Sequence, residues 1–131
     1  MSVITVTPTK SLITSGLVAT AGAGAATSVV AAVGAFAGIS LAVGGVPIPV
    51  SGFGVLTVVF SLVGLALALV LARWARRPRT MFVRVTMVLT ALSLVPDVLA
   101  DAATSTKMLL MLTHVVAAAI VIPAIARRLS A

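Results

Sequence analysis

Residues 81–101 read MFVRVTMVLTALSLVPDVLAD, and this stretch decides what kind of protein the chain can form. It is apolar for about twenty residues, which is the length of helix that crosses the hydrocarbon core of a bilayer. It ends in Asp97 and Asp101, the only acidic residues of the chain. Two carboxylates one helical turn apart at the end of a membrane-spanning stretch need a structural or a chemical reason.

Three other segments have the same character. Together with 81–100, the segments 12–43, 50–72 and 107–126 are long enough to span a bilayer as helices. Charged residues make up only 8% of the chain, against about a quarter in soluble domains, so a soluble surface cannot be built. The alternation typical of transmembrane strands does not occur. We predict an all-α membrane protein, with residues 1–131 forming a single four-transmembrane-helix bundle.

The basic residues gather at the ends of these segments. Four arginines lie in the connection at 73–80, Lys10 precedes the first segment, and Arg127 and Arg128 follow the last. Despite a net charge of +7, this placement predicts no nucleic acid as a partner. With an even number of spans the basic residues fall on one side, which the positive-inside rule makes cytoplasmic. We expect a multi-pass protein of the cell membrane with both termini in the cytoplasm.

The first segment has two features of its own. The small-residue triplet at 23–25 resembles a signal cleavage site, but the apolar run continues about twenty residues beyond it, so we expect a retained helix. A row of small residues at a spacing of four lets a neighbouring backbone approach closely. The row consists of Gly16, Thr20, Gly24, Ser28 and Ala32. It could pack within the chain or form a homo-oligomer. The sequence GGVPIP at 44–49 then predicts a short outer loop.

Polar residues form a stripe along the third segment. At about 100° per residue they share one face, provided that the helix continues through Pro96 with a kink. The stripe consists of Thr86, Thr90, Ser93, Asp97, Asp101 and Thr104. A helix that ended before Pro96 would be too short for the hydrocarbon core.

The fourth segment carries the only histidine, His114. Ser105 and Thr106 are candidate caps for a helix that begins near Lys107. His114 would then lie about 10 Å along this helix, at a depth similar to that of Asp97 on the neighbouring antiparallel helix. Because the connection between the two segments is short, they are adjacent, and we expect these two side chains to be able to make contact.

Ionisable groups inside a membrane usually face the bundle interior and mark functional positions. The candidate catalytic residues are Asp97, Asp101 and His114, and the candidate residues lining a substrate site or ion path are Ser93, Thr90 and Met111. Structural explanations stay open. Asp101 could end its helix beside Lys107 or water, and Asp97 could form a purely structural pair with His114 or a hydrogen bond to the first segment.

Other chemistries have little support. One histidine and two aspartates without close spacing on one element predict no metal site. The chain has no cysteine, no glycine-rich phosphate loop with its lysine and no nucleophile elbow. We expect neither a metal nor a cofactor.

A resemblance to other proteins rests on SLVPD at residues 93–97, on Leu112-Thr113-His114 and on the Pro123 that follows. Over its whole length the chain resembles a group of uncharacterised small four-helix integral membrane proteins of actinobacteria. In size, helix count and membrane-embedded acids it is also similar to the small membrane-bound terpene cyclases of actinomycete indole-terpenoid pathways. Those enzymes protonate a prenyl alkene to start ring closure.

Three functions therefore compete. The cyclase resemblance implies that Asp97, held protonated in a dry pocket, protonates a lipophilic prenylated substrate while Asp101 or His114 tunes it. The same stripe also suits a proton-coupled small transporter or an ion path. An accessory or scaffold protein without a site is the third. We expect the lipid bilayer and a lipophilic small molecule as partners, with an apolar pocket beside Asp97 and His114 in the outer half of the bundle.

Overall fold

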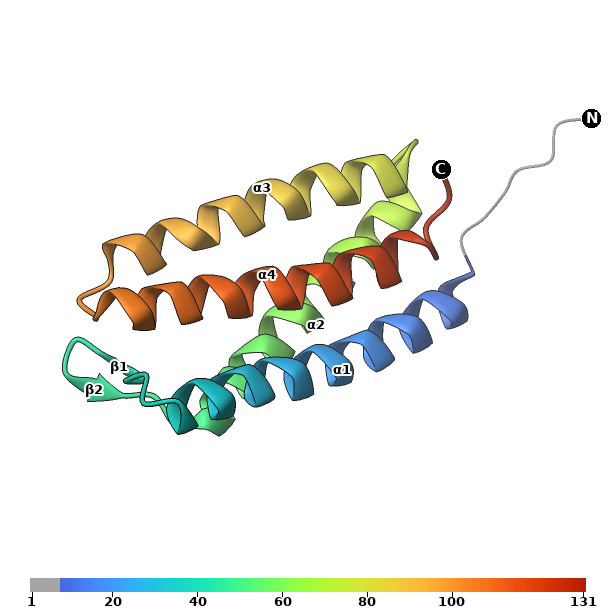
Figure 1. The fold of residues 1–131 in the computed structure, drawn as a ribbon. Coiled ribbons are helices and arrows are strands. Elements are labelled where there is room, and N and C mark those ends of the chain that lie inside the picture. The colour runs from blue at the N-terminus through green and yellow to red at the C-terminus, as the bar shows by residue number, and fades with distance from the viewer. Residues whose placement is uncertain (1–7) are drawn as a thin grey trace, which may run out of the picture.

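The computed structural model describes residues 8–131, which fold into four long helices and one small hairpin (Figure 1). The elements are α1 (Thr9–Phe36), β1 (Ala42–Val43), β2 (Val46–Pro47), α2 (Val50–Trp74), α3 (Pro78–Leu99) and α4 (Thr104–Ala126). Each of the four helices is long and apolar enough to cross a membrane. The chain is thus a four-helix membrane protein, as the sequence predicted.

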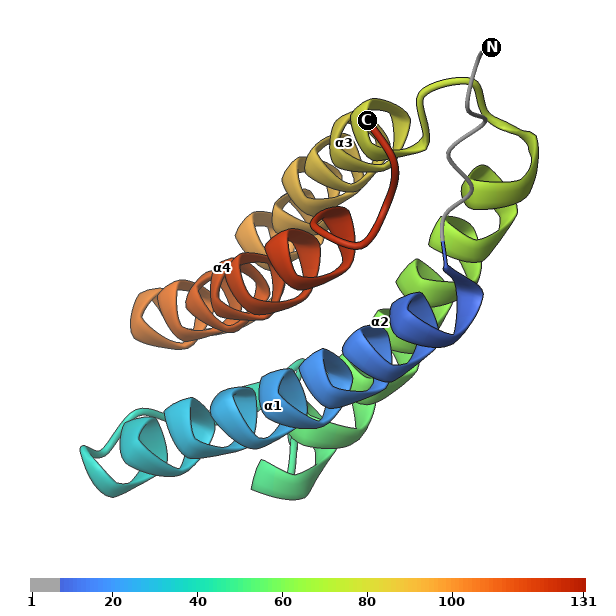
Figure 2. The same ribbon diagram turned by 90° about the vertical axis from the view of Figure 1, so that its right-hand side faces the viewer.

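In the view of Figure 2 the helices lie as two pairs, α1 with α2 and α3 with α4, although α4 packs more extensively against α1 than against α3. The pairs meet mainly where α1 packs against α4, whereas α2 approaches α3 and α4 only sparsely. The start of α1, the connection between α2 and α3 and the end of α4 lie at one end of the bundle, and the hairpin lies at the other. The ends of the described chain therefore share one side, as predicted, while the cytoplasmic location of that side stays a prediction.

The first helix is shorter than the predicted segment 12–43, because α1 ends at Phe36. Gly38 has a φ of 90°, and the N–H groups of Gly38 and Ile39 donate back to carbonyls of the last helical turn. This is the Schellman ending of a helix, which requires a left-handed residue and therefore favours glycine. The local ending thus overrides the apolar composition that continues past it.

The residues after this ending form a hairpin, not only the loop predicted at 44–49. Gly44 and Gly45 have φ values of 60° and 77°, and Val43 pairs with Val46 in an antiparallel register. Two successive positive φ values are what a two-residue hairpin turn needs. The N–H of Gly44 donates to the carbonyl of Asp101 at 2.7 Å, which fastens the hairpin to the turn between α3 and α4.

The third helix begins at Pro78, slightly before the predicted start, with the proline in the first turn where its missing N–H costs nothing. As predicted, α3 continues through Pro96, and it ends at Leu99.

The predicted start of the fourth helix is wrong. α4 begins at Thr104, and no side chain caps this end. The predicted cap Thr106 instead donates its hydroxyl to the carbonyl of Ser40 at 2.5 Å, in the connection that follows α1. Tertiary contact with the first connection has thus replaced local capping.

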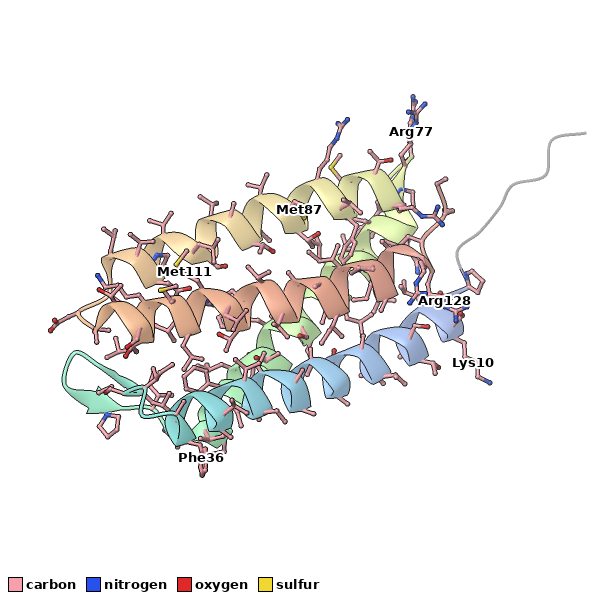
Figure 3. All side chains as sticks on the ribbon, in the orientation of Figure 1. Lys10, Phe36, Arg77, Met87, Met111 and Arg128 are labelled. Atoms are coloured by element: carbon pink, nitrogen blue, oxygen red, sulfur yellow. The ribbon has the colours of Figure 1, made fainter. Side chains whose placement is uncertain are left out.

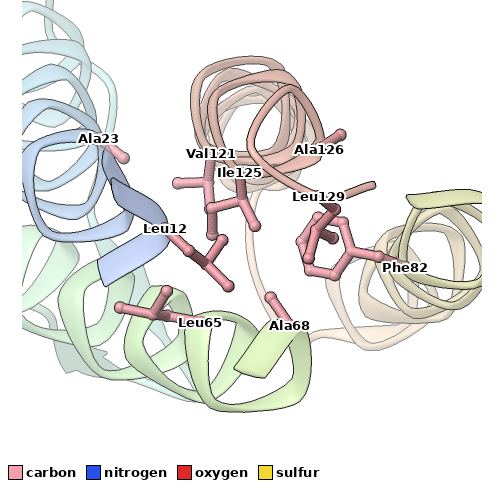
Figure 4. Close-up of a cluster of buried hydrophobic side chains, with 9 residues drawn as sticks. All are labelled: Leu12, Ala23, Leu65, Ala68, Phe82, Val121, Ile125, Ala126 and Leu129. Atoms are coloured by element: carbon pink, nitrogen blue, oxygen red, sulfur yellow. The ribbon is translucent and has the colours of Figure 1, made fainter. Parts of the chain in front are cut away.

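A hydrophobic cluster fills the bundle at the end that holds the start of α1 and the end of α4 (Figure 4). It includes Leu12, Leu65, Phe82, Val121, Ile125 and Leu129. Arg79 Nε donates to the carbonyls of Ala126 and Leu129 at 2.9 and 3.0 Å, so the turn after α4 is held against the start of α3. The core therefore closes this end of the bundle.

The small-residue row on α1 is used within the chain. Gly16, Thr20 and Gly24 are buried, while Ala32 is exposed. A Cβ added to Gly16 would collide with the Leu65 side chain of α2. Packing between α1 and α2 is thus the use that the structure shows, and a homo-oligomer through the row stays a prediction.

Candidate functional site

Asp97 of α3 and His114 of α4 contact each other. Asp97 Oδ2 lies 2.6 Å from His114 Nδ1, the distance of an ion pair, and both atoms are buried with no hydrogen-bond partner among the described residues. Asp97 is 6% exposed, whereas the side chain of His114 is 39% exposed. The expected contact is present, and each of these two atoms depends on the other.

At this short distance two facing lone pairs would repel, so one of the two atoms carries a proton. When Asp97 is ionised and the imidazole is neutral, that proton is on Nδ1 of His114 and Nε2 keeps a lone pair. A carboxylate held against one imidazole nitrogen fixes both the tautomer and the orientation of the ring. His114 is therefore arranged to accept or donate a proton at Nε2.

His114 also borders a groove between the two helix pairs. The groove has a volume of about 340 Å³ and is lined mainly by apolar side chains of α2, α3 and α4. This volume lies in the range of small-molecule sites, which begins at about 300 Å³. Phe60, Val63 and Leu89 lie on its wall and are each more than half exposed, so the groove opens sideways, where lipid surrounds a membrane bundle.

Only half of the predicted polar stripe lies along a wall of this groove, and its last two members, Asp101 and Thr104, lie beyond the end of α3. Thr86, Thr90 and Ser93 all line the groove, and each hydroxyl donates to a carbonyl of the preceding helical turn. Thr113 of α4 does the same. Because these hydroxyl protons are already used, the wall offers a bound molecule hydrogen-bond acceptors more readily than donors.

Three of the six predicted site residues, Asp97, Met111 and Asp101, lie off this wall. Asp97 is not among the residues that line the groove and reaches it only through His114. Met111, which Figure 3 labels, is half-buried and does not line the groove either. Thr90, Ser93 and His114 are therefore the predicted residues that the structure brings to one surface.

Asp101 is exposed in the turn after α3. Lys107 does not pair with it, because the Lys107 ammonium donates to the carbonyl of Val98 at 2.9 Å. The single ion pair among residues 8–131 joins Asp97 to His114. The contact that the structure shows for Asp101 is made by its backbone carbonyl, which accepts the hydrogen bond from Gly44 of the hairpin.

Sequence reasoning missed the wall that α2 provides. Phe53, Phe60 and Ser61 line the groove, yet α2 carries no ionisable residue before its basic end. The available signal was weak: Thr57 and Ser61, one turn apart in an otherwise apolar helix, both lie on this wall. In the described part of the chain no three histidine, cysteine or acidic side chains come together as metal ligands would.

The chain belongs to a family of unknown function, DUF6069, which matches it over residues 7–131. A comparison with curated proteins and a comparison with solved structures each found no match. The actinobacterial group and the terpene cyclases do not appear in these findings, so both resemblances stay predictions. The family match itself names no activity.

Proposed function

We propose that this membrane protein holds a lipophilic molecule in the groove between its helix pairs and exchanges a proton with it through His114. The observation that carries the proposal is the 2.6 Å contact between Asp97 and His114 at the wall of a mostly apolar groove. Apolar walls select a lipophilic molecule, and the sideways opening lets it arrive from the bilayer. Asp97 orients the imidazole, and His114 meets the bound molecule.

The reaction class that fits this arrangement is isomerisation by proton transfer, of which ring closure is one form. General acid–base catalysis needs the proton-transferring atom within hydrogen-bond reach of the substrate, and Nε2 of His114 meets that condition better than Asp97 does. Protonation of an isolated alkene needs a stronger acid than imidazolium. The geometry therefore supports proton transfer beside a heteroatom or a conjugated group better than the predicted protonation of a prenyl alkene by Asp97.

The hydroxyls along α3 favour a second candidate, a proton or ion path past Ser93, Thr90 and Thr86. Against it, Phe82 and Val121, which line the groove, belong to the core that closes the bundle. If the wild type conducted protons in proteoliposomes and Asp97→Asn did not, the proton path would be favoured over proton exchange with a bound molecule. A scaffold without a site would be indicated by wild-type behaviour of that variant in every assay.

A photoreactive farnesol analogue with a diazirine group tests occupation of the groove in nanodiscs. We expect it to label the walls around Phe60 and Leu89. Ala118→Phe, which places a ring in the groove, should abolish this labelling. The matched control is Ala119→Phe, at the exposed neighbouring position of the same helix, which should label like the wild type. Equal labelling of the two variants would contradict binding in the groove.

A further inference from the structure

Positive charge is concentrated at the end of the bundle that the hydrophobic core closes. Eight of the nine basic residues lie toward this end, from Lys10 in the first turn of α1 to Arg128 after α4, with Arg84 furthest inside a helix, and only Lys107 lies at the hairpin end. Figure 3 labels Lys10, Arg77 and Arg128 at this end. We call these eight residues the cationic end.

The cationic end has no acidic side chain to neutralise it. Both acidic residues, Asp97 and Asp101, lie at the opposite end of α3 or just beyond it. In the described chain the only ion pair is the one between Asp97 and His114. A set of unpaired cations at the ends of membrane-spanning helices lies at the depth of lipid headgroups, where anionic lipids supply the missing negative charge.

Two details make this end more than a diffuse charge. Arg76 and Arg77 are exposed in the short connection between α2 and α3. The Nε atom of Arg79 donates to the backbone carbonyls of Ala126 and Leu129, and these two hydrogen bonds hold the side chain in place without using its terminal amino groups. Its terminal amino groups can therefore meet a phosphate, for which the planar guanidinium is suited. Trp74, 75% exposed at the end of α2, lies beside them as an interfacial anchor.

We propose that the cationic end binds the headgroups of anionic phospholipids and so enriches them around this end of the bundle. The proposal rests on charge complementarity at the helix ends. It is independent of the groove, since His114 and Asp97 take no part in it.

The only tryptophan of the chain provides a local reporter. The protein is reconstituted in bilayers in which either phosphatidylglycerol or phosphatidylcholine carries bromine near the headgroup end of its chains. Bromine quenches Trp74 fluorescence on contact, so the ratio of quenching measures which lipid is the neighbour. At low salt we expect the quenching ratio to favour the anionic lipid about fivefold, which is the effect of roughly one basic residue near the membrane surface. At high salt the ratio should be smaller, because salt screens the attraction.

Charge variants assign the effect to named residues. Arg76→Gln/Arg77→Gln should lower the preference by at least half, while Arg76→Lys/Arg77→Lys should keep most of it. Lys107→Gln removes a charge from the opposite end and should leave the ratio unchanged. Equal quenching by both lipids in the wild type, or an unchanged ratio in the glutamine variant, would overturn the proposal.

Inorganic phosphate distinguishes a lipid surface from a site for a free anion. Added at constant ionic strength, it should lower the ratio no more than chloride does. Loss of the preference at low millimolar phosphate would assign the cationic end to a free anion and would contradict lipid binding.

Discussion

The two sides of α2 meet their neighbours in opposite ways. Towards α1, Gly54 lies so close to Ser28 and Gly24 that an added Cβ would collide, and the hydroxyls of Thr27 and Thr57 lie 2.8 Å apart across the two helices. Towards α3 and α4, large side chains such as Phe60 border an open groove. We call the first side the seam.

The difference teaches where stability and function reside in such a bundle. In lipid, apolar helices associate through close van der Waals packing and interhelical hydrogen bonds, because lipid tails are as apolar as the side chains. The seam has both. The groove has neither along α2, and its single interhelical polar contact, between Asp97 and His114, lies at the wall formed by the other pair. Substitutions should therefore separate into those that loosen the seam and those that change the groove.

The largest effect is expected from Gly54→Val in the seam. Its Cβ would overlap the Ser28 hydroxyl and lie 3.1 Å from the Gly24 carbonyl, so backbone must move. We expect a loss of about 3 kcal/mol in the free energy of unfolding, the upper part of the range for overpacking. Denaturation in mixed micelles measures it.

The matched control is Gly64→Val, on the groove side of the same helix, where an added Cβ meets nothing within 4 Å. It should change the free energy of unfolding by less than about 0.5 kcal/mol. Similar losses for the two variants would remove the contrast between the two sides of α2.

A smaller loss is expected when the pair at the groove wall is broken. His114→Ala leaves the buried Asp97 carboxylate without its partner, which should cost about 2 kcal/mol. In a double-mutant cycle with Asp97→Ala, the second substitution should then add little, because the two side chains act together. Asp101→Ala, at the exposed acid nearby, should be close to neutral. Additive losses from His114 and Asp97 would show that the contact is not energetically coupled.

The smallest expected difference in stability is between two threonine-to-valine substitutions, one in the seam and one at the groove wall. Thr27→Val removes a fully buried hydroxyl that lies 2.8 Å from that of Thr57, and should cost about 1 kcal/mol. Thr90→Val removes a hydroxyl that bonds only within α3 at the groove wall, and should cost less than about 0.5 kcal/mol. Thermal unfolding in one detergent compares them. A larger loss from Thr90→Val would mean that the groove side stabilises the bundle more than the seam does.

Cysteine labelling tests the orientation of the groove in the membrane. The chain has no cysteine, so single introduced residues report without background. From the predicted topology, an impermeant reagent outside the cell should label Ala103→Cys at the hairpin end and miss Arg77→Cys at the cationic end. The reverse pattern would place Asp97 and His114 near the cytoplasmic side.

The sequence predicted the features that depend on composition and local periodicity. The number and approximate positions of the helices followed from apolar runs, and the continuation of α3 through Pro96 followed from the length that a bilayer requires. The contact between Asp97 and His114 followed from a polar stripe, a short connection and the high cost of isolated polar groups in lipid. These arguments need no knowledge of how the two helix pairs meet.

The wall that α2 contributes to the groove could not be predicted, for the same physical reason that made the spans easy to find. α2 is apolar around its whole circumference, so no hydrophobic face shows which side packs against protein and which faces a cavity. The pocket was expected beside both Asp97 and His114, whereas of the two only His114 lines the groove. The hairpin was missed because its signal, the Gly44-Gly45 pair, predicted only a turn in a short outer loop.

The state of His114 tests the central proposal most directly. Because the chain has one histidine, protein labelled with ¹⁵N-histidine in nanodiscs gives one pair of imidazole nitrogen signals. We predict that Nδ1 carries the proton, and that the farnesol analogue shifts the Nε2 signal in the wild type but not in Ala118→Phe. An unprotonated Nδ1, or an Nε2 signal that the analogue leaves unchanged in the wild type, would contradict proton exchange through this residue.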